Sequence, residues 1–163
     1  MRKHLIRTSA TLALALTSAI AACGGLPAAA NPSPTSSCVN ASAPHHAYVV
    51  VEHLSGSSLQ WCVGFSTDTI DGQTLMDQSD IQFQTQTFSF GKLACQIDHE
   101  PAQFSQCSPP NQPYWNLFIE TSGAWKSAST GYTAITLNDK EALGWHYVQP
   151  TDPSPAPPPL AKG

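Results

Sequence analysis

Short runs of apolar and β-branched residues predict a mostly β-stranded domain with a single helix. Seven runs rich in β-branched and aromatic residues are predicted as strands, at 47–52, 59–65, 81–88, 94–98, 113–120, 132–137 and 143–148. The segment 71–78 is predicted as a helix that Thr69 or Asp71 would cap. Leu75 and Met76 would then face the sheet.

Three details of this pattern refine the expected fold. The polar turn at 55–58 joins the first two strands into a hairpin. Within 81–88 the alternation of apolar residues breaks after position 83, which indicates a bulge or a bend. The segment 125–131 is polar and is expected to be irregular between two firm strands. One hairpin, one helix and then several strands predict an α+β domain with a mostly antiparallel sheet and one short helix.

The beginning of the chain has the composition of an export signal. Residues 1–22 combine a basic start with a short apolar stretch, as in a secretory signal peptide. The residues Ile20-Ala21-Ala22 before Cys23 resemble the lipobox of bacterial lipoproteins. This resemblance implies acylation of Cys23 and anchoring to the outer face of the cell membrane through acyl chains. Cleavage without acylation, after Ala22 or near 28–30, is the alternative.

The remaining chain divides into three parts by composition. Residues 23–45 are rich in Ala, Pro and Ser and are predicted as a flexible tether. The folded domain is predicted at 46–149. The proline-rich segment 150–163 is predicted as an extended polyproline II tail with a solvated end.

Removal of the predicted signal leaves an acidic chain without arginine. Four lysines stand against all 11 acidic residues, a formal net charge of −7. Such a chain lacks the positive charge that nucleic-acid binding requires. We therefore expect an extracytoplasmic protein that binds no nucleic acid.

Four cysteines in the mature domain predict two disulfide bonds. Outside the cytoplasm an even number of cysteines usually indicates disulfides, and four allow three pairings. Cys95 and Cys107 bracket a short, turn-rich segment, so their pairing is favoured and Cys38 is left with Cys62. Metal binding is the competing interpretation, but no C-x-x-C or H-x-x-x-H spacing supports it. We expect no metal and no cofactor.

Asp98, His99 and Glu100 form the most compact titratable cluster of the sequence. A histidine beside carboxylates can act as a base or a pH switch, although an exposed polar turn accounts for the same residues. The sequence contains no Gly-x-Ser-x-Gly elbow, phosphate-binding loop or dinucleotide fingerprint. We therefore expect no catalytic residue and no enzymatic activity.

The order of several landmarks resembles a known domain family. They are Trp61-Cys62-Val63, Asp71-Gly72, Leu75, Cys95-Gln96-Ile97-Asp98, Cys107, Tyr114-Trp115, Trp125, Gly131 and Gly144-Trp145. Over about 46–148 they resemble the domain of unknown function that is similar to the C-terminal domain of transcobalamin and intrinsic factor. This resemblance implies a β-grasp-like fold and a surface lipoprotein of actinobacterial type. It also implies a cobalamin-like ligand, held together with a second carrier domain or a transporter.

The resemblance further implies where a ligand would bind. The loop that faces the corrin in the carriers matches Trp125, Ser129, Thr130 and Gly131 here. An indole covers apolar ligand surface and hydroxyls orient it. The alternative, which the residues themselves favour, is that Trp125 is a core or rim residue that closes a hairpin. Trp61, Trp115 and Trp145 lie within predicted strands and are expected in the core. The expected function is accessory ligand binding for uptake; the alternative is a non-catalytic structural or protein-interaction module of the cell envelope.

Overall fold

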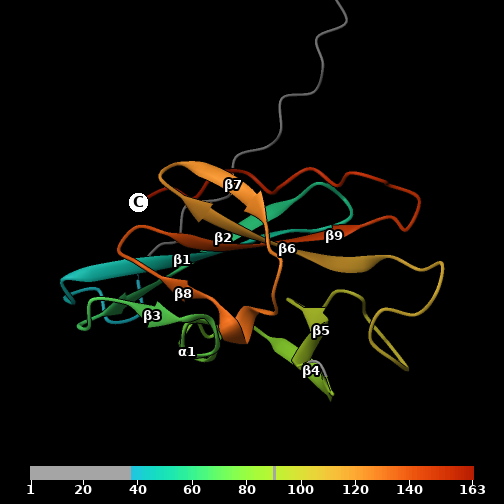
Figure 1. The fold of residues 1–163 in the computed structure, drawn as a ribbon, viewed down its shortest axis with the longest axis horizontal. Coiled ribbons are helices and arrows are strands. Elements are labelled where there is room, and N and C mark those ends of the chain that lie inside the picture. Colours follow the sequence, from blue (N-terminus) through green and yellow to red (C-terminus); the bar gives the residue numbers. More distant parts are fainter. Residues whose placement is uncertain (1–37, 90) are drawn as a thin grey trace, which may run out of the picture.

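A mixed five-stranded sheet forms the centre of the molecule in the computed structural model, which describes residues 38–89 and 91–163 (Figure 1). Its strands lie in the order β2-β1-β9-β6-β7. Their bounds are β1 His45–Glu52, β2 Ser58–Phe65, β6 Tyr114–Thr121, β7 Ala124–Ser127 and β9 Ala142–Val148. Neighbouring strands are antiparallel except β1 and β9, which pair in parallel. The predicted signal peptide, Cys23 and most of the predicted tether lie outside the described residues.

One face of the sheet, called the inner face here, is covered by the remaining elements. They are α1 Gly72–Gln78, the 3-10 helix η1 Tyr132–Ala134, and the strand pairs β3 Ile70–Asp71 with β8 Thr136–Leu137 and β4 Phe83–Phe88 with β5 Gly91–Ile97. Leu75 and Met76 of α1 belong to the main hydrophobic core, together with Val49 of β1. The side chain of Asp71 caps the helix by accepting a hydrogen bond from the Thr74 backbone N–H. The predicted helix and its cap are confirmed.

This connectivity is β-grasp-like. A first hairpin leads into the helix, and the last strand returns to lie beside the first in the middle of the sheet. The α+β class, the mostly antiparallel sheet and the single short helix are therefore confirmed. The register shift between Gln84 and Thr85 is the bulge that the broken alternation indicated. Trp115 and Trp145 are buried in the core, as expected, and Trp61 packs against it half-buried.

The sequence-based assignment was wrong over 125–127 and 132–135, whereas 128–131 is irregular as predicted. Ser122 and Gly123 both have positive φ angles, so the chain turns tightly and 124–127 pairs with β6 as β7 instead of staying irregular. The predicted strand 132–137 is a 3-10 turn followed by the two-residue strand β8. Its buried residues are Tyr132, Ile135 and Leu137, a spacing of three and then two that fits a turn before a strand.

Two disulfide bonds join Cys38 to Cys62 and Cys95 to Cys107, which confirms the favoured pairing. The first attaches the residues that precede β1 to β2, where the Val39 N–H also donates to the Cys62 carbonyl. The end of the predicted tether is thus part of the fold. The second closes the loop that follows β5. Disulfides of this kind are typical of proteins outside the reducing cytoplasm.

The outer face of the sheet is covered by the C-terminal segment, drawn in red in Figure 1. The expectation of a solvated end is wrong, because Pro158 is buried and the Lys162 backbone is hydrogen-bonded to Gln60 of β2. Among the described residues, no helix has both the length and the apolar character that crossing a membrane would require.

Candidate ligand-binding cleft

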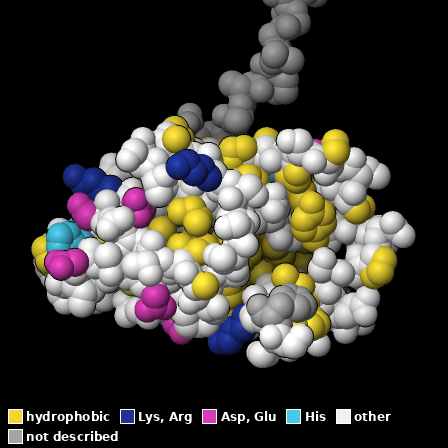
Figure 2. Space-filling model, viewed as in Figure 1, with side chains coloured by type: hydrophobic (Ala, Val, Ile, Leu, Met, Phe, Trp, Pro, Cys, Tyr) yellow, Lys and Arg dark blue, Asp and Glu magenta, His cyan; other side chains and the backbone are white. Residues whose placement is uncertain are grey.

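A cleft opens on the inner side of the molecule, where the β4–β5 hairpin stands beside β6. Among the described residues this hairpin forms a two-stranded sheet of its own, so its backbone does not close against the five-stranded sheet. Two cavities of about 630 Å³ and about 300 Å³ lie there, and Ala94 and Trp115 line both of them. Figure 2 shows hydrophobic side chains gathered in this hollow. Both volumes are in the range of small-molecule sites.

The larger cavity contains three of the four residues that the sequence proposed for ligand contact. Ser129, Thr130 and Gly131 form one wall, opposite Lys92 and Leu93 of β5. Ser129 and Thr130 are exposed. The wall is held in place by backbone hydrogen bonds at both of its ends. Ala128 N–H donates to the Leu117 carbonyl at 2.9 Å, and Ala134 N–H to the Gly131 carbonyl at 3.0 Å.

The base of the larger cavity is aromatic and rigid. Tyr132 packs edge-on against Phe83 at 5.3 Å and against Trp145 at 5.9 Å between ring centroids. The Tyr132 hydroxyl donates to Gln73 Oε1 at 3.1 Å, and Lys92 Nζ donates to the same oxygen at 2.8 Å. Burial, together with the charge of Asp77, raises the pKa of Tyr132 above its ordinary value.

An unpaired hydrogen-bond donor lies in the same wall. Trp145 lines the larger cavity and is 4 % exposed. Its indole N–H is buried and has no hydrogen-bond partner among the described residues. The indole N–H of Trp125, on the outer face of the sheet, is likewise buried without a partner among the described residues. Buried donors are nearly always paired in proteins, so both groups are unusual.

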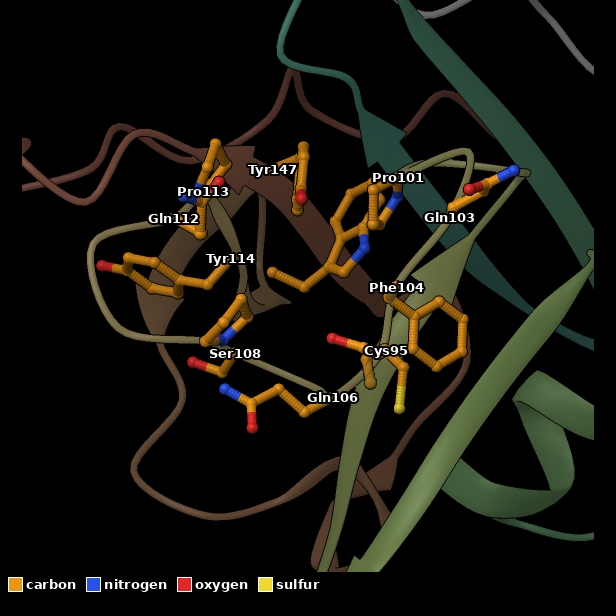
Figure 3. Close-up of a pocket in the computed structure, with 14 residues that line it drawn as sticks. Cys95, Pro101, Gln103, Phe104, Gln106, Ser108, Gln112, Pro113, Tyr114 and Tyr147 are labelled. Carbon is orange, nitrogen blue, oxygen red and sulfur yellow. The ribbon is translucent and has the colours of Figure 1, made fainter.

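The smaller cavity is built largely by the disulfide loop that follows β5. Figure 3 shows Phe104 and Tyr114 on opposite sides of this cavity, with Gln106 and Ser108 along one edge. None of the described residues that line it is charged. Amides and hydroxyls offer donors and acceptors without charge, and aromatic faces cover apolar ligand surface. This lining suits a neutral ligand that has both polar and apolar groups.

His53 fixes the disulfide loop to the end of β1. Its Nδ1 lies 2.7 Å from Glu100 Oε2, and its Nε2 lies 3.0 Å from Asp98 Oδ2. The Glu100 carbonyl also accepts a hydrogen bond from the Trp115 indole at 3.1 Å. The structure therefore joins two members of the predicted titratable cluster to His53, while His99 is exposed. Sequence reasoning missed His53, because it lies 45 residues before Asp98.

Trp125 does not line either cavity. It stands opposite Glu120 in the β6–β7 pair, and so it points to the outer face of the sheet. There it packs with Tyr48, Cys62 and Ala142. The four residues that the family resemblance groups together are thus divided between the two faces.

The described residues contain no group of three or more His, Cys, Asp or Glu side chains placed to hold a metal ion. The four described cysteines are engaged in disulfides, and the carboxylates of Asp98 and Glu100 are paired with His53. The predicted absence of a cofactor stays a prediction.

No protein-family model matches the chain, and no curated protein matches it. One solved structure to which the fold is distantly similar is a protein of Ruminococcus gnavus described as a "putative metal binding protein". The similarity has a TM-score of 0.46 at 16% sequence identity, and it covers 64% of this chain and 97% of that one.

Proposed function

We propose that this protein is an extracytoplasmic, non-catalytic binding protein that holds a neutral ligand in the cleft between β6 and the β4–β5 hairpin. The observation that carries the proposal is the composition of the cleft wall. The aromatic residues Tyr132 and Trp145 and the exposed residues Ser129 and Thr130 line one cavity. Lys92, the charged residue among the described lining residues, is already hydrogen-bonded to Gln73.

The finer proposal is that the ligand is a corrinoid. It is supported by the sequence resemblance to the C-terminal domain of the cobalamin carriers. A corrinoid is far larger than either cavity, so the open cleft would cover one side of it and leave the rest in water. Affinity of the domain alone would therefore be weak, since much of the available ligand surface stays unburied. A second carrier domain or a transporter would cover the other side.

Acylation of Cys23 would place this binding domain at the outer face of the membrane. The supporting observation is the lipobox-like sequence that ends at Cys23. Replacement of Cys23 by Ser should move the protein out of the membrane fraction and abolish acyl labelling. Unchanged labelling of the C23S variant would rule out this anchor.

Binding is tested by equilibrium dialysis of the full chain against cobalamin and cobinamide. Thr130→Trp is expected to weaken binding at least about tenfold, because the added ring fills the larger cavity. Thr87→Trp is the matched control, since Thr87 is equally exposed on β4 but lines neither cavity. Retained binding by T130W, equal loss in both variants, or no binding by the wild type would contradict a corrinoid site in this cleft.

A further inference from the structure

The C-terminal segment is held on the outer face by directed hydrogen bonds to its backbone. Ala161 N–H donates to Glu120 Oε2 at 2.8 Å. Lys162 N–H donates to Gln60 Oε1 at 2.8 Å, and the Lys162 carbonyl accepts from Gln60 Nε2 at 2.6 Å. Further back, the Ala156 carbonyl lies 2.7 Å from His146 Nδ1. Four polar groups of 156–162 thus meet side chains from β2, β6 and β9.

These contacts address the backbone and not the side chains of the segment. An extended proline-rich chain makes no internal hydrogen bonds, so its carbonyls and its few N–H groups are free for a partner. Gln60 contacts both the N–H and the carbonyl of a single residue. Glu120 carries a carboxylate and yet is only 5 % exposed. Its Oε2 accepts a hydrogen bond from the Ala161 N–H. Carboxylates are rarely buried unless they are paired in this way.

A shallow apolar seat for proline lies between these polar contacts. Pro158 is buried over Gly144 of β9, beside the indole of Trp125. A methyl group on Gly144 would lie 2.8 Å from Pro158 Cγ and 2.7 Å from Trp125 Cζ3, so only glycine leaves room for the ring there. Aromatic-lined seats for proline, combined with hydrogen bonds to the backbone, are the mode by which proteins bind polyproline II segments.

We infer that the outer face of the sheet is a binding site for a proline-rich polypeptide segment, and that residues 156–162 of the chain occupy it intramolecularly. The site lies on the face opposite to the proposed ligand cleft and does not depend on that function. The connection to the core passes through an exposed turn at 149–154, closed by Asp152 N–H donating to the Gln149 carbonyl at 3.1 Å. Because residues 156–162 belong to the same chain, they compete with any free segment at an effective concentration of about 1 mM. A free proline-rich segment would therefore bind only after these residues have left the site.

The test cuts the turn at 149–154 in the otherwise complete protein. A site for a sequence-specific protease is inserted in the turn at 150–152, and binding of a fluorescent peptide of residues 153–163 is measured before and after cleavage. Saturable binding that is at least about tenfold tighter after cleavage is expected, because the bound tail becomes exchangeable. Failure of the peptide to exchange, or loss of the folded circular dichroism spectrum after cleavage, would show that the segment is only a structural part of the domain.

Modified peptides separate specific binding from general stickiness without any change in the protein. Methylation of the Ala161 nitrogen removes the donor to Glu120 and is expected to weaken binding about tenfold. Methylation of the Leu160 nitrogen is the matched control, since Leu160 is exposed and none of the hydrogen bonds above uses its N–H. Equal affinity of the two methylated peptides and the unmodified peptide would overturn the proposed site.

Discussion

The inner face of the sheet is covered by elements that fold on their own hydrogen bonds, whereas the outer face is covered by a segment without regular structure. On the inner face, the strands of the β4–β5 hairpin pair with each other and form no backbone ladder with the five-stranded sheet. The cleft lies between this hairpin and β6. On the outer face, 156–162 has no internal ladder and takes its hydrogen bonds from the sheet residues. A segment whose strands pair with each other can lie against the sheet and still leave a cavity. A segment without such pairing must follow the sheet surface closely, because its backbone finds its hydrogen-bond partners there.

Two tryptophans on opposite faces give the sharpest test of this contrast. Trp145→Ala should lower the free energy of unfolding by about 3–5 kcal/mol, because it removes a large side chain from the main core. Trp125→Ala should keep the fold and cost about 1–3 kcal/mol, since it loosens the half-buried outer cluster around Tyr48 together with the seat of Pro158. Urea denaturation followed by circular dichroism measures both values. A larger loss in W125A than in W145A would reverse the comparison.

Removal of the second disulfide should weaken the inner side and leave the outer side unchanged. Replacing Cys95 and Cys107 together by Ser is expected to lower the free energy of unfolding by about 2–4 kcal/mol, because the disulfide no longer restricts the unfolded chain. Proteases should then cleave the loop at 101–109, which lines the smaller cavity, faster than in the wild type. The His53 contacts to Asp98 and Glu100 should remain. Increased cleavage at 149–155 in this variant would show that the two faces are coupled.

A single methyl group at Gly144 should loosen the outer cover. Gly144→Ala is expected to cost about 1–3 kcal/mol, because its Cβ would press on both Pro158 and Trp125. Limited proteolysis followed by mass spectrometry should then detect faster cleavage in 149–163. Gly131→Ala is the control, since a Cβ there lies 3.7 Å from the Lys92 carbonyl and meets ordinary contact distances. Equal protection of the tail in wild type and G144A would contradict the seat described for Pro158.

The smallest expected effect concerns the carboxylates of Glu120 and Asp71, whose contributions to the free energy of unfolding should change with pH in opposite directions. Burial raises the pKa of Glu120, partly offset by the hydrogen bond from Ala161 N–H. The native state therefore binds more protons than the unfolded state between the ordinary pKa and the raised one, and stability falls as pH rises through that window. Glu120→Gln keeps the acceptor oxygen and removes the charge. Its stability relative to wild type should increase with pH there.

Asp71 should show the opposite sign. Hydrogen bonds from the backbone and side chain of Thr74 lower the pKa of Asp71, so its stabilising effect is present above the unfolded-state pKa and is lost as pH falls through the folded-state value. Asp71→Asn retains a good cap residue but removes the carboxylate. Its stability relative to wild type should therefore decrease as pH rises through this window. Urea denaturation from about pH 3 to pH 7 covers both windows. The same sign for E120Q and D71N would refute the assignment.

The family resemblance and the local pattern predicted different parts of the candidate cleft. Ser129, Thr130 and Gly131 were proposed from the resemblance, and they do line one cavity. Trp145, which supplies the unpaired donor, was assigned only to the core, because its strand pattern says nothing about the hydrogen-bond state of its indole. The role of His53 depends on a contact across 45 residues, and no local spacing indicates such a contact.

The sequence by itself determined the first hairpin, the capped helix, the bulge and the two disulfides. These features depend on neighbouring residues, on alternation with a period of two, or on the ease of closing a short loop. Only the tertiary structure decided that 132–134 turns under the sheet, that Trp125 and Ser129 lie on opposite faces, and that the proline-rich end is bound. Each of these is set by contacts between residues far apart in the chain. For 156–162 the polar groups of Gln60, Glu120 and His146 supply hydrogen-bond partners that the segment lacks within itself, and composition alone gives no sign of them.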